Sequence, residues 1–346
     1  FVKALKRLLL FLTCVLVLSG VTGCGQKAYK KEFYSLFETI SSLTVYADSE
    51  EEFEETAQYF ENELTRYHQL FNIYDDFEGI HNLKTVNDHA GKAPVKVDEE
   101  IIELLKFCRE MYEKTDGEVN AAFGSVLSIW HDYREDGMEN PDTAKLPPMD
   151  ALKSAAEHTS FDDVIIDEEN RTVYLKDEKL QLDVGAIAKG YAVEKIAASL
   201  KDRGVTSALI DVGGNIEAIG EKGDHTKWRL GLQNPSLESD DFYIHTIDIS
   251  DKALVTSGSY QRYYTVDGKR YHHIIGKETL MPSDMYTSVS VICDDSGIGD
   301  ALSTALFNMD IEEGTALADA FGAAVLWIEP DGRETMTGGF ESYISE

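Results

Sequence analysis

Basic residues and cysteines are scarce in this 346-residue chain. It carries 32 Lys and Arg against 63 Asp and Glu, which gives a formal net charge of −31 at pH 7. Such a surface repels a phosphate backbone, so nucleic acid is excluded as a partner. The four cysteines form no Cys-x-x-Cys pair and no cluster with histidine, which argues against a zinc site. Cys108 and Cys293 fall in apolar patterns typical of buried thiols, and a disulfide between them stays open.

Long apolar runs are also absent. The longest, from Leu8 to Leu18, follows Lys3, Lys6 and Arg7 and is shorter than the roughly 20 residues that a membrane-spanning helix needs. A basic start, an apolar segment and small residues before Cys24 are typical of a secretory signal with a lipidation site. We therefore expect residues 1–23 to be a lipoprotein signal peptide, Cys24 to carry the lipid, and residues 24–31 to be a polar tether. An uncleaved anchor is the alternative, and both place the remaining chain outside the cytoplasm.

Helical and alternating apolar patterns interleave along residues 32–346 without a regular strand–helix–strand repeat. The helical pattern predicts helices at 49–71, 98–114 and 311–321, and a helical piece at 125–130 that gives way to a polar loop at 133–148. Alternation predicts strands that include 179–182. The chain contains no low-complexity tract that would separate domains. The class is therefore α+β, with 32–346 as one domain.

Two distant segments organise the functional prediction. Residues 183–190, Asp-Val-Gly-Ala-Ile-Ala-Lys-Gly, turn through glycine into a helix with Lys189 in its first turn, and free backbone N–H groups there suit a phosphate. Asp300 and Thr304 share one face of a later helix. A carboxylate and a hydroxyl are hard oxygen ligands of the kind that Mg²⁺ takes together with phosphate oxygens. Each pattern alone is more often a plain turn or a helix cap.

Five motifs in a fixed order give these segments a family resemblance. They are Asp183-Val-Gly-Ala-Ile-Ala-Lys-Gly190, Asp211-Val-Gly-Gly-Asn215, Thr256-Ser-Gly-Ser-Tyr260, His272-His-Ile-Ile275 and Asp300-Ala-Leu-Ser-Thr304. In this order the chain resembles the ApbE family, the FAD:protein FMN transferases, also described as flavin-trafficking lipoproteins. The resemblance implies an ApbE-like (T-fold-like) architecture, in which mixed sheets flanked by helices form a single two-lobed catalytic domain.

The resemblance also implies an activity and its partners. FAD is the substrate, and its FMN part is transferred to a Ser or Thr hydroxyl of an exported acceptor as a phosphoester, with release of AMP. The acceptor would be a redox-complex subunit or a protein with an FMN-binding domain. Mg²⁺ would be the cofactor, held by the Ala186 carbonyl, the Asp300 carboxylate and the Thr304 hydroxyl. Lys189 would face the phosphates, and Asp183 would face a polar group of FAD.

The remaining site residues follow from the same resemblance. His273 is the implied general base, because histidine titrates near neutrality, while the neighbouring His272 would point the other way on a strand. Tyr74 is the candidate that lies against the flavin, with a core tyrosine as the alternative. Ile275 would pack near the flavin, and Glu118, Val119 and Asn120 stand where relatives contact it with different residue types. Relatives commonly continue the histidine motif with Asp-Pro, whereas this chain has Gly276-Lys277.

Two alternative functions would use some of the same residues. With water as the nucleophile, the same residues would make an Mg²⁺-dependent FAD pyrophosphatase that yields FMN and AMP. A non-catalytic flavin- or solute-binding lipoprotein would need neither His273 nor the Asp300–Thr304 pair, so their presence counts against it. The expected location is the extracytoplasmic face of the cell membrane, through the lipid on Cys24.

Overall fold

The structure is a computed structural model that describes residues 26–236, 239 and 241–345. The predicted signal peptide and Cys24 lie outside these residues. Within them, no helix is both long enough and apolar enough to cross a bilayer.

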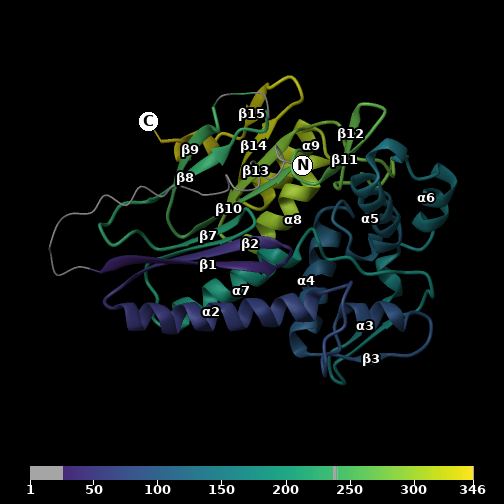
Figure 1. Cartoon of the computed structure of the whole chain (residues 1–346), viewed down its shortest axis with the longest axis horizontal. Coiled ribbons are helices and arrows are strands. Elements are labelled where there is room, and N and C mark those ends of the chain that lie inside the picture. Colours follow the sequence, from purple (N-terminus) through teal and green to yellow (C-terminus); the bar gives the residue numbers. More distant parts are fainter. Residues whose placement is uncertain (1–25, 237–238, 240, 346) are drawn as a thin grey trace.

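One eight-stranded sheet runs through the molecule (Figure 1), and every neighbouring pair of its strands is antiparallel. Its strands in spatial order are β1 (Lys27–Leu36), β2 (Thr39–Ala47), β6 (Ala208–Val212), β7 (Asn215–Ile219), β10 (Lys252–Gly258), β13 (Ser288–Cys293), β14 (Ala324–Ile328) and β15 (Glu334–Met336). Strands far apart in the sequence are neighbours in this order. The sheet therefore brings residues from the whole chain to one surface.

Four helices cover one face of the sheet. Helices α2 (Glu50–Phe71) and α7 (Ala188–Asp202) pack on the end formed by β1, β2, β6 and β7, and α8 (Ser296–Phe307) and α9 (Ile311–Ala320) pack on β10, β13 and β14. The hairpin of β8 (Trp228–Gln233) and β9 (Tyr243–Ile249) closes the opposite face, where Trp228, Leu232 and Ile249 contact apolar side chains of the sheet. Both faces are thus covered, which explains the fully buried pattern of β13 and β14.

A second lobe lies beside this layered part (Figure 1). It contains a three-stranded sheet, a hairpin and four further helices. These are β3 (Val95–Lys96), β4 (Val164–Asp167), β5 (Thr172–Leu175), β11 (Tyr263–Val266), β12 (Lys269–His272), α3 (Leu83–Asp88), α4 (Glu99–Lys114), α5 (Gly124–Glu139) and α6 (Met149–Ala156). The predicted α+β class with mixed sheets and flanking helices is confirmed.

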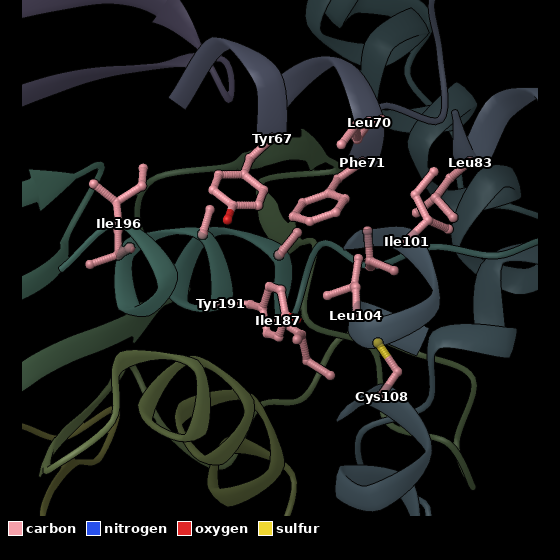
Figure 2. Packing of buried hydrophobic residues seen from close by; sticks show 14 of the residues in the cluster. Tyr67, Leu70, Phe71, Leu83, Ile101, Leu104, Cys108, Ile187, Tyr191 and Ile196 are labelled. Carbon is pink, nitrogen blue, oxygen red and sulfur yellow. The ribbon is translucent and has the colours of Figure 1, made fainter. Parts of the chain in front are cut away.

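The helix ends follow the local sequence. The Ser49 side chain caps α2 by accepting the Glu52 N–H, and the Asp98 side chain caps α4 by accepting the Glu100 N–H, so the predictions for 49–71 and 98–114 are confirmed. Figure 2 shows the apolar faces of α2, α4 and α7 meeting in one core. There Phe71 of α2 lies edge-on to Tyr191 of α7, with ring centroids 6.0 Å apart. This core holds the start of α7, and hence the first predicted motif, in place.

The predicted tether is wrong for its described part. Residues 27–31 form the first half of strand β1, and they pair with residues 43–47 of β2. Tyr29 stacks on Phe53 of α2 at 5.4 Å between ring centroids. The polar composition of this segment reflects an edge strand with one solvent-facing side, which sequence alone does not distinguish from a tether.

Two other local predictions change. Residues 179–182 form no strand, and Lys179 lies in a turn. The Gly124 N–H donates to the Gln181 carbonyl at 3.0 Å, and the Asn87 side chain forms hydrogen bonds with both the N–H and the carbonyl of Leu182. Helix α5 does not end near residue 130 but continues to Glu139. Its polar second half packs on the β11–β12 hairpin, where Gly137 lies against the Tyr264 ring. Cys108 and Cys293 are free and buried, which closes the question of a disulfide.

An acidic side chain is buried between the sheet and α7. Glu217 on β7 has no exposed surface and pairs with Lys201 of α7, with Nζ and Oε1 3.4 Å apart. Burial raises its pKa from an ordinary 4.5 to about 8, and the nearby carboxylates of Glu194 and Asp295 act in the same direction while Lys201 opposes them. Glu217 is therefore protonated in the folded protein at neutral pH and ionised in the unfolded chain.

The Glu217→Gln variant is expected to become more stable than the parent as the pH rises. Because the folded pKa is the higher one, the stabilising contribution of protonated Glu217 is complete below about pH 4.5 and is lost as the pH passes through about 8. The melting temperatures of variant and parent should lie close together near pH 5 and differ by several degrees near pH 9. Glu221→Gln, at an exposed position, is the matched control. A difference that stays constant with pH would contradict this assignment.

Candidate functional site

Helices α7 and α8 approach each other at Gly190, and this contact joins the two predicted motifs. A Cβ atom on Gly190 would lie 2.5 Å from the Asp300 Cβ atom and closer still to the Ser296 carbonyl oxygen. On the other side of the crossing, a Cβ atom on Gly297 would lie 3.3 Å from the Tyr191 Cα atom. Glycine therefore allows a backbone approach that no larger residue would permit. The Asp300 side chain is placed against the first turn of α7.

Asp300 is held by groups from α7. Its Oδ2 atom accepts the Gly190 N–H at 2.9 Å, its Oδ1 atom lies 3.8 Å from Lys189 Nζ, and the residue is 4 % exposed. Burial raises the pKa of this carboxyl group, whereas Lys189, the Gly190 N–H and the Asn215 side chain each lower it. Asn215 begins β7 directly after the Gly213–Gly214 turn. Residues from three of the five motifs therefore meet at Asp300.

The predicted magnesium ligands lie around the same contact. In a regular helix the Gly190 N–H would donate to the Ala186 carbonyl, four residues earlier. Here it donates to Asp300 instead, so that hydrogen bond to the Ala186 oxygen is not made. Thr304 follows one turn after Asp300 on α8 and is partly exposed. One carboxylate, one carbonyl and one hydroxyl fit a Mg²⁺ ion that takes its other ligands from phosphate and water.

No site rich in charged ligands accompanies these groups. Across 26–236, 239 and 241–345, no three His, Cys, Asp or Glu side chains gather in a way that could hold a metal ion. The oxygen set at Asp300 contains a single carboxylate. Its binding of Mg²⁺ stays a prediction.

The two adjacent histidines have different environments, although the strand expected to separate them, β12, ends at His272 and His273 follows it. His272 is 8 % exposed; its Nε2–H donates to the Ser283 carbonyl at 2.6 Å and its Nδ1 accepts the Ile274 N–H at 3.2 Å. Both ring nitrogens are used, so His272 is a structural residue. His273 is only partly buried, and its Nδ1 lies 3.3 Å from the Arg262 carbonyl. Because a carbonyl can only accept, the proton is on Nδ1 and Nε2 carries the lone pair.

His273 stays neutral over a wide pH range. Burial lowers its pKa to about 3, and the positive charges of Arg262 and Arg134 add to that effect. An unprotonated ring nitrogen is the form that a general base requires. A pKa of about 3 also makes Nε2 a weak base, so the expected titration near neutrality is not met, and what the geometry offers for the predicted role is a free, unprotonated Nε2.

Tyr74 and Asp183 lie in a polar cluster that also contains two residues missed from the sequence. The Tyr74 ring stacks on His131 of α5, with centroids 4.9 Å apart and planes 26° apart. His131 Nδ1 accepts a hydrogen bond from Arg134 at 2.9 Å. Asp183 Oδ1 accepts the Gly185 N–H at 2.8 Å, and its pKa is raised by burial and lowered by that bond and by His131 and Arg134. Tyr74 is 47 % exposed, so it is not a core tyrosine.

His131 and Arg134 were missed because the helix was expected to end near residue 130. Their spacing of three residues places them on the same face of α5. A helical histidine followed three positions later by arginine was the available signal, and it became meaningful once α5 was known to continue.

The segment at 118–120 serves mainly to connect the second lobe. The Val119 side chain is buried in the main core. The Asn120 side chain accepts the Ala122 N–H and donates to the Thr159 carbonyl, at 2.8 and 2.9 Å. Glu118 forms an ion pair with Lys277, with Oε1 and Nζ 3.1 Å apart. Contact of these three residues with flavin stays a prediction.

The Glu118–Lys277 ion pair gives a physical role to the Gly276-Lys277 sequence that replaces the usual Asp-Pro. It ties the loop after β12 to the segment before α5. The adjacent Ile275 is 7 % exposed and packs with Trp130, Tyr264 and Leu280. The contact of Ile275 with the flavin stays a prediction.

Comparison with known proteins identifies the family of this chain. A sequence profile described as the ApbE family matches residues 37–327. The chain belongs to the ApbE family. Relatives include the FAD:protein FMN transferase of Treponema pallidum (strain Nichols), 34 % identical over 344 residues that cover 94 % of this chain and 92 % of that protein. A protein of the same name from Klebsiella pneumoniae (strain 342) is 33 % identical over 73 % of this chain and 77 % of its own.

Solved ApbE structures have the same fold. The crystal structure of the ApbE protein from Thermotoga maritima superposes with a TM-score of 0.80, at 28 % identity, over 92 % of this chain and 100 % of that one. The flavin transferase ApbE from Vibrio cholerae gives a TM-score of 0.75 at 24 % identity, over 92 % of this chain and 100 % of its own. The predicted family, the ApbE-like fold and the predicted class of enzyme, a flavin transferase, are confirmed.

The Gly190→Ala variant is expected to be less stable than the parent, although alanine ordinarily favours a helix over glycine by up to about 1 kcal/mol. The added methyl group overlaps the Ser296 carbonyl and Asp300, and overpacking of this kind costs about 1–3 kcal/mol. Urea unfolding measures the difference. Gly338→Ala is the matched control, since a Cβ atom there meets nothing within 4 Å. Equal loss of stability in both variants would show that the helix crossing does not depend on Gly190.

Proposed function

We propose that this chain transfers FMN from FAD to a Ser or Thr hydroxyl of an exported acceptor protein, in an Mg²⁺-dependent reaction that releases AMP. Membership of the ApbE family supports the flavin substrate, because the relatives named above are FAD:protein FMN transferases. The observation that carries the proposal is the meeting of Lys189, Asp300 and the start of α7 at one point. A diphosphate needs such a place, where positive charge and N–H groups gather.

In the proposed reaction the acceptor hydroxyl oxygen attacks the phosphorus of the FMN part of FAD. A new P–O bond forms to the acceptor, the bond from the FMN phosphorus to the oxygen that bridges the two phosphates breaks, and AMP leaves with that oxygen. The hydroxyl proton passes to His273 Nε2, because the Nδ1–H is engaged with the Arg262 carbonyl. Lys189 orients and neutralises the diphosphate.

Asp300, Thr304 and the Ala186 carbonyl would hold the Mg²⁺ ion. When bound, the ion neutralises the charge that develops on the phosphate oxygens. Asp300 also holds the first turn of α7 through the Gly190 N–H, which fixes the direction of the Lys189 side chain.

One experiment separates transfer from hydrolysis and from simple binding. The protein is incubated with FAD and MgCl₂, with and without an exported acceptor that contains a Ser or Thr in an FMN-binding domain, and mass spectrometry measures FMN on the acceptor. We expect modification that depends on acceptor and Mg²⁺, is lost in Asp300→Ala and Thr304→Ala, and is slowed on the order of 100-fold or more in His273→Ala without loss of FAD binding.

The other possible outcomes favour a different function or a different role for His273. Free FMN and AMP formed equally without acceptor would mean a pyrophosphatase. FAD binding with no turnover under any condition would mean a flavin-binding protein. Full transfer by His273→Ala would contradict the general-base role alone. His272→Ala serves as the matched control, because it removes the structural neighbour and should lower stability rather than act on the chemical step.

We also propose that the protein is anchored by a lipid on Cys24 at the extracytoplasmic face of the membrane. The support is the sequence before Cys24 together with an acceptor that is itself exported. Expressed in a bacterial host with its own leader, the parent should fractionate with membranes, and Cys24→Ser should be soluble. Equal membrane association of both would favour an uncleaved apolar anchor.

A further inference from the structure

A partly buried cation, Arg134, lies beside the stacked rings of Tyr74 and His131 and forms only a weak direct ion pair among the described residues. The Arg134 side chain is 14 % exposed. Among the described residues its ion pairs are limited to Glu135, whose carboxylate is 3.4 Å away and 49 % exposed. A water-accessible carboxylate at that distance is a weak partner. Holding a guanidinium group out of water in this way is unfavourable unless another acceptor completes its hydrogen bonds.

The position of Arg134 is fixed by His131. Arginine can only donate, so the 2.9 Å contact makes His131 Nδ1 an acceptor and places the imidazole proton on Nε2. The His131 ring is in turn stacked on Tyr74. The cation therefore lies at the edge of a pair of parallel rings, and the guanidinium direction is set before any ligand arrives.

Arg134 faces candidate site residues from three separate segments. Its charge lowers the pKa of Tyr74, which follows α2, of Asp183, which precedes α7, and of His273, which follows β12, although in Tyr74 and Asp183 burial raises the pKa more. Lys189 acts on a different carboxylate, Asp300. The two cations thus lie at two different places: Lys189 at the α7–α8 contact, and Arg134 beside the stacked rings.

We propose that Arg134, oriented by His131, recognises the imide edge of the flavin ring together with Asp183. That edge presents a carbonyl, an N–H and a second carbonyl in a row. The Arg134 guanidinium donates to a ring carbonyl, and the Asp183 carboxylate accepts the ring N–H through Oδ2, since Oδ1 already accepts the Gly185 N–H. The Tyr74–His131 pair supplies an aromatic surface beside the ring. This inference rests on the proposed flavin substrate.

The assignment to the ring rather than the diphosphate follows from the neighbours of each cation. A diphosphate needs positive charge and N–H groups; at Lys189 and the start of α7 the neighbouring carboxylate, Asp300, is a predicted ligand of Mg²⁺, so a bound ion would neutralise it. Arg134 instead has a carboxylate and two aromatic rings beside it. A donor next to an acceptor complements an imide, whereas the Asp183 carboxylate would repel a phosphate.

The test uses two probes that each contain half of FAD. Riboflavin carries the ring without phosphate, and ADP carries a diphosphate without the ring. Flavin fluorescence quenching gives the Kd of riboflavin, and calorimetry in MgCl₂ gives the Kd of ADP. Arg134→Gln should weaken riboflavin binding about tenfold or more and change ADP binding less than twofold. Arg134→Lys should be intermediate, and Arg333→Gln, an exposed arginine, should bind both probes as the parent does.

A measurement on the unmodified protein guards against misfolding of the variants. Riboflavin methylated at the imide nitrogen lacks the N–H, so the parent should bind it about tenfold more weakly than riboflavin. In Asp183→Asn the preference between the two should fall. Equal binding of both flavins by the parent, no measurable riboflavin binding, or a loss of ADP affinity in Arg134→Gln as large as the loss for riboflavin would each overturn the inference.

These outcomes are separate from those of the transfer assay. Riboflavin binding with the expected pattern but no transfer to an acceptor would contradict the proposed function and leave ring recognition standing. Transfer to an acceptor by an Arg134→Gln variant that binds riboflavin as the parent does would contradict ring recognition by Arg134 and leave the proposed function standing.

Discussion

The close approach of α7 and α8 at Gly190 is the contact on which the candidate site depends. It brings the Asp300 carboxylate within 2.9 Å of a backbone N–H and 3.8 Å of Lys189 Nζ, across 110 positions of sequence. The approach is possible because glycine occupies the crossing on both helices. It is kept in place by the core beneath, where α2, α4 and α7 meet (Figure 2). Interior packing thus sets the distance between two polar groups.

The candidate site contains several positively charged residues, although the protein as a whole is strongly acidic. The chain has a formal net charge of −31, yet Lys189, Arg134 and Arg262 lie next to candidate site residues. A dinucleotide that carries negative charge would be repelled by the average surface and attracted at this one place. The carboxyl groups of Asp183, which is partly buried, and Asp300, which is buried, are close to these cations, and burial raises the pKa of both. The site is therefore neutralised locally.

Much of the fold was accessible from the sequence, and so was the grouping of three motifs at Asp300, for reasons that differ between residues. Helices such as 98–114 were predicted because a capping side chain and an apolar stripe are local features. His272 and His273 were assigned to opposite sides because a strand alternates; β12 ends at His272, yet the two side chains do differ, the first being structural and the second keeping a free Nε2. The errors occur where composition was ambiguous: residues 27–31 look like a tether and are an edge strand, and the polar second half of α5 looks like a loop.

The sequence by itself determined the family, the α+β class, the acidic surface and the order of the motifs, because each of these is a property of residue types and their local spacing. Only the tertiary structure decided which of those residues meet. The contact of Asp300 with the start of α7, the Arg262 carbonyl that sets the His273 tautomer, and the place of Arg134 beside Tyr74 and Asp183 all join segments far apart in the chain. Such contacts depend on how helices and strands pack, and the space available at a crossing is not encoded by any one segment alone.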